Sequence, residues 1–436
     1  MQRAKQIPFY FCLALLAYMP FHIFLSQSLS LLTGGLEVWK VAKDILLAAM
    51  TVFAVCLVWW SGRANRLFYW LLGGAIAYGV LHMLLWKLHP DIYRQSAILG
   101  FTFNMRLPTL LMLGYSAALL KPDFSRATIA KILIAVSTVV AALGILQYFL
   151  PKDILSHVGY GLDRGVRAAF FIDDNPQYPR IMSTLRDPNS LAAFLLLPIT
   201  FISLLVARVK NATERWGLMA ALAVQIGALV LTFARSALIA LALSLLFAFA
   251  WQYRQLLMGF LQRFWLVLVV VLVVLGFGLY SQRTSMVYQQ YIVHSSNDSD
   301  LDSNDYHRIF LERGLHGIAD EPLGHGPGTA GLASIQNPKG SFLTENYYVQ
   351  IGYEVGLLGL VLFLLLNGVV YLKLLPQRRQ VLVVALLASF WGYVAMNMLL
   401  HIWSNEAVAT QWWLVAGLMI VSAGSAAQYK TKATHQ

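Results

Sequence analysis

Long apolar stretches separated by short polar segments dominate the pattern of residues along the chain. Most of these stretches reach the ~20 residues that a helix needs to cross the hydrocarbon core of a bilayer. The pattern therefore predicts about twelve membrane-spanning helices. Their approximate ranges are 8–30, 41–61, 67–86, 96–120, 131–150, 190–207, 216–233, 236–252, 264–281, 346–372, 380–400 and 408–426.

The composition leads to the same class of protein. Of the 436 residues, 58% are hydrophobic and 12% are charged, and the mean hydropathy is +0.64. Soluble domains carry about a quarter charged residues, so this composition excludes a water-soluble globule and a disordered chain. We predict an all-α polytopic membrane protein in which residues 1–436 form a single integral membrane domain.

The formal net charge of +12 is explained by the positive-inside rule. If the N-terminus is cytoplasmic and the predicted spans alternate, the cytoplasmic segments hold 17 of the 32 basic residues and two acidic ones, a net charge of +15. The remainder of the chain then carries −3. The excess positive charge therefore predicts two cytoplasmic termini, and it does not indicate a nucleic-acid partner.

Two non-cytoplasmic loops, residues 151–189 and 282–345, are much longer than the others. Long loops in compact proteins are often functional. Within the second loop, residues 306–315 have the pattern of an amphipathic helix, and a glycine-rich bend follows at residues 321–328. Functional residues are therefore expected in and beside these loops.

Two arginines lie where charge is unusual. Arg106 falls inside the fourth predicted span, where it is either paired in the protein interior or snorkels to the interface beside Pro108. Arg235 lies in the tight turn between the seventh and eighth predicted spans, where Gly, Asn or Asp would suit a simple turn. It is either part of an anion-binding site or an interfacial anchor.

Further cationic candidates lie in the long loops. Arg186 directly precedes Asp187 and Pro188, which suit a helix start, and a guanidinium beside a helix N-terminus is suited to phosphate oxygens. Arg308, His307 and His325 are candidates in the second loop. A single loop histidine is more often a surface or packing residue than a base, so both readings stay open for the two histidines.

Two glutamates lie near the start of the tenth predicted span. Glu345 and Glu354 are nine residues apart, about two and a half helical turns, so a regular helix would place them on roughly opposite faces. Glu345, at the loop junction, is the better candidate for a general base. For Glu354, which lies deeper, the simplest interpretation is an ion pair with an arginine.

Four of these segments, in this order, resemble the bacterial O-antigen ligase and polysaccharide polymerase superfamily. The resemblance extends over roughly residues 180–365. The segments are Arg186–Ala192, Leu231–Ala237, Arg308 with Glu321–Gly328, and Glu345–Gly359. Each motif is degenerate alone, but their order and their shared side of the membrane make the set specific.

The resemblance implies a GT-C-like glycosyltransferase of the bacterial inner membrane, with two larger periplasmic loops and an active site that faces the periplasm. Such enzymes transfer a glycan from undecaprenyl pyrophosphate to an acceptor hydroxyl with inversion, without a metal or another cofactor. By resemblance, Arg235 and Arg308 contact the pyrophosphate, Arg186 is a third candidate, and Glu345 is the catalytic base. His307, His325, Arg106 and Glu354 remain auxiliary candidates.

One departure from the family bears on the reaction. Many ligases have histidine where this chain has Glu345. We therefore expect a polymerase of capsule, exopolysaccharide or O-antigen repeats, acting on a glycan or lipid-linked acceptor among membrane lipids. The alternatives are an O-antigen ligase that transfers the glycan to lipid A-core, a polysaccharide transporter or flippase, and a scaffold for other envelope enzymes.

Overall fold

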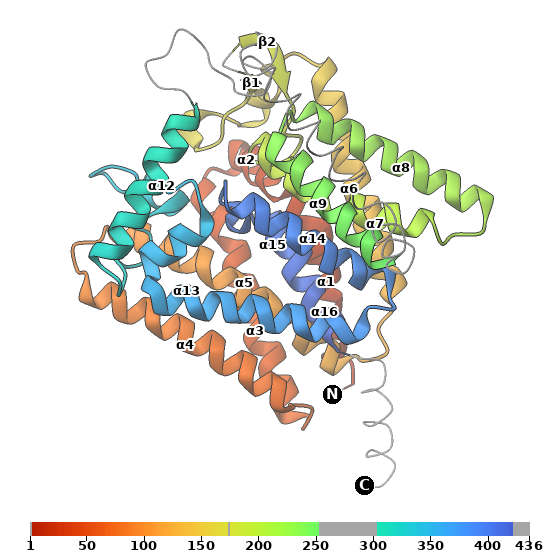
Figure 1. Cartoon of the computed structure of the whole chain (residues 1–436), viewed down its shortest axis with the longest axis horizontal. Coiled ribbons are helices and arrows are strands. Elements are labelled where there is room, and N and C mark those ends of the chain that lie inside the picture. Colours follow the sequence, from red (N-terminus) through yellow and green to blue (C-terminus); the bar gives the residue numbers. More distant parts are fainter. Residues whose placement is uncertain (1, 173–174, 253–302, 422–436) are drawn as a thin grey trace, which may run out of the picture.

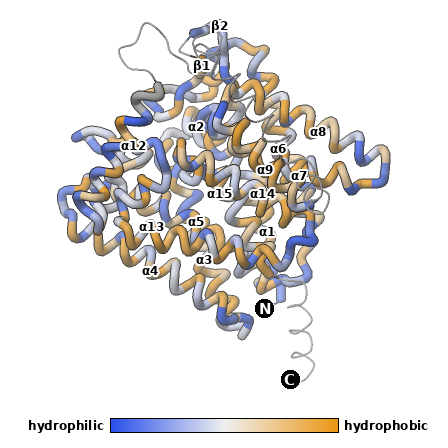
Figure 2. Tube along the Cα trace, viewed as in Figure 1, coloured by the Kyte–Doolittle hydropathy of each residue, from blue (hydrophilic) through white to orange (hydrophobic). Residues whose placement is uncertain are grey.

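The computed structural model describes residues 2–172, 175–252 and 303–421 (Figure 1). In this part of the chain, nine helical segments are long and apolar enough to cross a membrane. Hydrophobic residues follow the helices, and hydrophilic residues gather toward the helix ends and loops (Figure 2). The prediction of an all-α polytopic membrane protein is confirmed. The predicted span at 264–281 lies outside the described residues, so the count of twelve stays a prediction.

The nine segments agree closely with nine of the predicted stretches. They are Ala4–Thr33 (containing α1, Ile7–Tyr18, and α2, His22–Thr33), α3 (Leu36–Trp60), α4 (Arg66–Leu88), α5 (Arg94–Leu120), α6 (Arg126–Phe149), α7 (Pro188–Val206), α8 (Ala212–Leu231), α9 (Arg235–Gln252), and Tyr347–Gln377, which contains α13 (Tyr347–Leu374).

The eleventh predicted span is shorter than expected, and the described part of the twelfth, up to residue 421, has an irregular helical structure. The first of them is α14 (Val381–Asn397), and the second is divided into α15 (Glu406–Ala409), a π-helical turn at Thr410–Leu414, and α16 (Val415–Ile420). This segment begins at Glu406, two residues before the predicted start, because Asn405 caps α15 by accepting hydrogen bonds from the backbone N–H groups of Ala407 and Val408.

Close backbone packing holds the interior of the helix assembly. A Cβ atom on Gly114 of α5 would lie 2.3 Å from the carbonyl oxygen of Leu414, and one on Gly417 of α16 would lie 2.5 Å from that of Leu111. Small residues allow such contact between membrane helices, where dispersion and backbone proximity replace the hydrophobic drive. These two glycines therefore fix α5 against the C-terminal helical segment.

The antiparallel packing of α9 and α7 on α14 brings several helix ends together. A Cβ atom on Gly392 of α14 would lie 2.7 Å from the carbonyl oxygen of Ala240 in α9, and the Tyr393 hydroxyl donates to the carbonyl of Ala193 in α7 (3.1 Å). Ala240 lies five residues after the start of α9, and Gly392 lies five residues before the end of α14. At a rise of 1.5 Å per residue, each of these two helix ends is about 7.5 Å along its helix axis from the contact. The starts of α7 and α9 therefore lie at the end of α14.

The two long loops also carry structure. Residues Phe170–Ile172 (β1) and Asn175–Arg180 (β2) form a small antiparallel sheet that the hydrophobic pattern does not predict. In the second loop, the predicted amphipathic helix is confirmed as α12 (Ser303–Asp320), which packs on α13. This packing brings α12 beside the start of α13, where the candidate site lies.

Candidate functional site

Glu345 lies just outside α13 in a strained backbone conformation. Its φ is +51°, a left-handed value that costs a non-glycine residue roughly 1–2 kcal/mol. The next residue, Asn346, caps α13 by accepting hydrogen bonds from the N–H groups of Tyr348 (2.9 Å) and Val349 (3.0 Å). Its amide also donates to the carbonyl of Met398 at the end of α14 (3.0 Å). The surrounding contacts therefore hold Glu345 in a conformation that it would not favour alone.

His307 of α12 lies beside Glu345. Its Nδ1 lies 3.6 Å from Oε2 of Glu345, and both side chains are partly accessible. Burial raises the pKa of Glu345 above its ordinary value of 4.5, and the nearby His307 acts in the opposite direction. A carboxylate with a raised pKa is a stronger proton acceptor, which suits general base catalysis.

A second histidine, His401, lies beside this pair and was not among the site residues predicted from the sequence. Its Nε2 lies 3.3 Å from Oγ1 of Thr344, the residue before Glu345. Burial and the proximity of His307 lower the pKa of His401 to about 4, so the ring is neutral at pH 7. The sequence feature that could have identified His401 is its position at the end of the eleventh predicted span, on the same side of the membrane as the two long loops.

Backbone strain recurs at the segments that carry the candidate arginines. In the described part of the chain, the non-glycine residues with a positive φ are Ser183, Phe233 and Glu345. Ser183 lies three residues before Arg186, and Phe233 lies two residues before Arg235. Such strain persists where the surroundings over-determine the backbone, and it is concentrated at binding and catalytic sites. Each of the three residues also lies within five residues of a helix start.

The contacts of the loop before α7 show how the first strained segment is held. Gln147 accepts hydrogen bonds from the backbone N–H groups of Met182 (3.1 Å) and Ser183 (2.8 Å). Arg180 donates to the carbonyl of Thr232 in the α8–α9 turn (2.9 Å). The segment before Arg186 is therefore fastened to the turn that carries Arg235.

The three candidate arginines lie at helix starts or beside the Glu345 pair. Arg186 directly precedes Asp187, which caps α7 by accepting from the backbone N–H of Ser190 (2.8 Å). Arg235 is the first residue of α9, and its side chain is exposed. Arg308 is exposed on α12, next to His307. Because helix N-termini carry partial positive charge, these positions favour an anion.

Glu354 has a structural role that differs from the predicted one. It is fully buried, and its Oε1 accepts hydrogen bonds from the backbone N–H groups of Gly328 (3.1 Å) and Ala330 (3.2 Å), while Asn104 donates to Oε2 (2.8 Å). The ion pair with an arginine was therefore the wrong interpretation, because backbone and amide donors satisfy the carboxylate. Glu354 anchors the glycine-rich bend against α5 and α13.

His325 belongs to that bend and not to the Glu345 pair. Its ring stacks on Tyr353 with a centroid distance of 3.8 Å and an interplanar angle of 5°. Its Nε2 lies 3.5 Å from Glu321, which also lies 3.3 Å from Nε2 of His89. These contacts place His325 about two helical turns along α13 from Glu345.

Arg106 is buried, so the snorkelling alternative is wrong. Its guanidinium lies 3.2 Å from Oδ1 of Asp44 in α3 and donates to the carbonyl of Ser404 (3.0 Å). The neighbouring Lys43 lies 3.8 Å from Glu406, which balances the local charge. Since Ser404 follows His401 by three residues, Arg106 supports the segment that carries this histidine.

Comparison with known proteins finds a family match over part of the chain. Residues 220–364 match the family model described as O-Antigen ligase. The matched range includes Arg235, Arg308 and Glu345, and the resemblance to the O-antigen ligase and polysaccharide polymerase superfamily is confirmed for this part of the chain. No curated protein matches the chain.

Proposed function

We propose that this membrane protein polymerises a glycan repeat by transferring the growing chain from undecaprenyl pyrophosphate to a hydroxyl of the acceptor glycan. The observation that carries the proposal is the Glu345–His307 pair, a partly buried carboxylate held in strained backbone beside the start of α13. The O-antigen ligase family match, which includes both residues, supports glycan transfer as the reaction class.

The reaction that fits this site is a single displacement at the anomeric carbon. Glu345 accepts the proton of the acceptor hydroxyl as its oxygen forms the new bond to that carbon, and the bond to the pyrophosphate oxygen breaks. Attack opposite the leaving group inverts the anomeric configuration. His307 orients the carboxylate, and the neutral His401 supports its position through Thr344.

The leaving pyrophosphate requires positive charge, and the helix starts at this end of the molecule supply it. Arg235 and Arg308 are proposed to neutralise the developing negative charge, with Arg186 as a third contact. The starts of α7, α9 and α13 add partial positive charge at the same end of α14. Positive groups that stabilise the negative charge developing on the leaving pyrophosphate lower the barrier to transfer without a metal. That the reaction needs no metal and no cofactor stays a prediction.

We place this end of the molecule at the periplasmic face of the bacterial inner membrane, with both termini in the cytoplasm. The support for this orientation is the distribution of basic residues, which are concentrated in the segments at the other end of the predicted spans and so favour that end as the cytoplasmic one. A polyprenyl donor keeps its pyrophosphate at the membrane surface, which is where the starts of α9 and α13 lie relative to their apolar segments.

The proposal is tested with Arg235→Ala, Arg308→Ala and Glu345→Gln in cells that lack the chromosomal copy. Each variant should insert normally and lose polymer. Arg167→Ala and Glu312→Gln are matched controls, because they remove an exposed charge in one of the same loops without touching the candidate site. Polymer of normal length in all three site variants would overturn the proposal.

The ligase alternative rests on the same family match and is separated by its products. Loss of a polymerase leaves single repeat units, whereas loss of a ligase leaves long chains on the lipid carrier. A transporter would instead move the lipid-linked glycan across proteoliposomes that contain no acceptor.

A further inference from the structure

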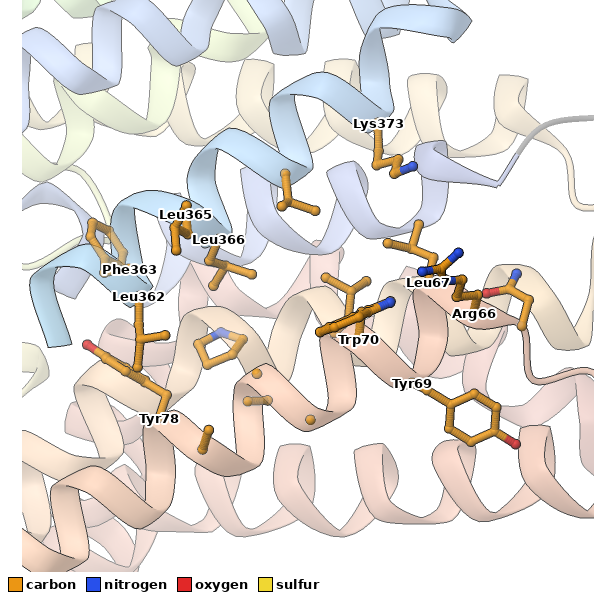
Figure 3. Close-up of a pocket in the computed structure, with 18 residues that line it drawn as sticks. Arg66, Leu67, Tyr69, Trp70, Tyr78, Leu362, Phe363, Leu365, Leu366 and Lys373 are labelled. Atoms are coloured by element: carbon orange, nitrogen blue, oxygen red, sulfur yellow. The ribbon is translucent and has the colours of Figure 1, made fainter. Parts of the chain in front are cut away.

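A large apolar pocket lies between α4 and α13, away from the Glu345 pair (Figure 3). Its volume is about 1150 Å³, slightly above the ~300–1,000 Å³ that is usual for small-molecule sites. The walls come from the first half of α4, the second half of α13 and Pro108 of α5. Because α4 and α13 run antiparallel here, the pocket extends along the membrane-spanning direction of both helices.

The pocket has one polar end and one apolar end. Arg66 at the start of α4 and Lys373 near the end of α13 lie at one end, while Tyr78 and Phe363 lie at the other (Figure 3). Within the part of the chain that the structure describes, the side chains of Arg66 and Lys373 have no hydrogen-bond or ion-pair partner. Two exposed cations therefore converge on the mouth of an otherwise apolar space.

The length of the pocket matches one leaflet of a bilayer. Twelve residues separate Arg66 from Tyr78 on α4, which is about 18 Å of helix. The hydrocarbon core is about 30 Å thick, so this distance covers roughly half of it. By the positive-inside rule, the cationic end lies at the cytoplasmic face, opposite the end of α13 that carries Glu345.

Glycines keep the floor of the pocket open. A Cβ atom on Gly73 or Gly74 of α4 would meet no other atom within 4 Å, and both residues line the pocket. Tyr69 and Trp70, one turn nearer the cationic end, provide the amphipathic rings that favour a membrane interface.

We propose that this pocket binds one anionic phospholipid of the cytoplasmic leaflet. Its phosphate lies between Arg66 and Lys373, and an acyl chain lies over Gly73 and Gly74. Charge complementarity favours this occupant over the polyprenyl tail of the donor, because a polyprenyl chain carries no anionic group at its far end. The site is distinct from the proposed transfer site, so either proposal can fail alone.

The test measures lipid binding to delipidated protein by native mass spectrometry, with phosphatidylglycerol or phosphatidylcholine as the probe. The wild type should prefer phosphatidylglycerol, and Arg66→Gln combined with Lys373→Gln should weaken that binding roughly 30-fold, from the contribution of two basic residues at a membrane surface. Lys210→Gln with Arg215→Gln is the matched control, since it removes two exposed charges on the same predicted face outside the pocket.

A second pair of variants tests the apolar part. Gly73→Leu should reduce binding of both lipids, whereas Gly368→Leu, at an equally open glycine of α13 outside the pocket, should not. Equal affinity for the two lipids in the wild type, or equal losses in the charge variant and its control, would overturn the proposal. Unchanged phosphatidylglycerol binding with weakened donor binding in Gly73→Leu would assign the pocket to the polyprenyl tail and also overturn it.

Discussion

The strained backbone at Glu345 predicts that activity and stability change in opposite directions when this residue is replaced. Glu345→Gly should abolish transfer and stabilise the fold. The left-handed φ of +51° costs glutamate roughly 1–2 kcal/mol, and glycine adopts it freely. Since glycine also loses about 0.5–1 kcal/mol more conformational entropy on folding, we expect a net gain of about 0.5–1 kcal/mol.

Glu345→Gln separates the two effects, because glutamine keeps the backbone strain and removes the base. Its transfer rate should fall by about 10²–10⁴, the usual contribution of a general base. Burial raises the pKa of Glu345, so the ionised carboxylate opposes folding, and this effect grows as the pH rises through that pKa. Glutamine cannot ionise, so the stability of this variant should be no lower than that of the wild type at neutral pH.

The assay combines thermal unfolding of purified protein in detergent with polymer length in complemented cells. Glu312→Gln, an exposed carboxylate on α12, should change neither measurement. Activity within a few-fold of the wild type in Glu345→Gln would show that Glu345 is not the base. A lower unfolding temperature in Glu345→Gly would show that the backbone is not strained as described.

Three other predictions concern the supporting contacts. Arg106→Met should destabilise the protein by about 1–3 kcal/mol, because it leaves the partly buried Asp44 with Lys43 as its counter-ion and removes the donor to the Ser404 carbonyl, and adding Asp44→Leu should recover part of the loss in the same unfolding assay. Glu354→Ala should cost about 3 kcal/mol by leaving buried N–H groups of the glycine-rich bend unpaired, and Glu354→Gln should cost clearly less; equal losses would contradict the role of the carboxylate oxygens. His307→Gln removes the imidazole that lowers the pKa of Glu345, so the acidic limb of the pH–rate profile should move to higher pH, and an unmoved limb would contradict the interaction of the two side chains.

The helices were predictable because their apolar stretches are long and continuous. The predicted ranges of nine spans agree with the described helices, and the amphipathic pattern at 306–315 identified α12. The π-helical turn at Thr410–Leu414 in the last segment was not predictable, because a local change of backbone hydrogen bonding does not interrupt the hydrophobic pattern. The small β1–β2 sheet was likewise not predictable, because β2 has no alternation of apolar and polar residues that would distinguish it from a loop.

The site was only partly visible in the sequence. Motif order indicated Glu345 and the arginines, but the pairing with His307 depends on the packing of α12 on α13. His401 lies 56 residues after Glu345, and the hydrogen bonds of Asn346 and Thr344 connect their segments. The partners of Glu354 are mainly backbone groups, which no residue pattern reports.

The most direct test of the proposed reaction is transfer by the purified protein in lipid nanodiscs. The substrate is a defined undecaprenyl pyrophosphate-linked repeat, and mass spectrometry follows both products. We expect release of undecaprenyl pyrophosphate together with a glycan one repeat longer on the lipid carrier, with an inverted new linkage, and neither product with Glu345→Gln. Intact substrate after incubation with folded wild-type protein, or equal turnover by Glu345→Gln, would contradict it.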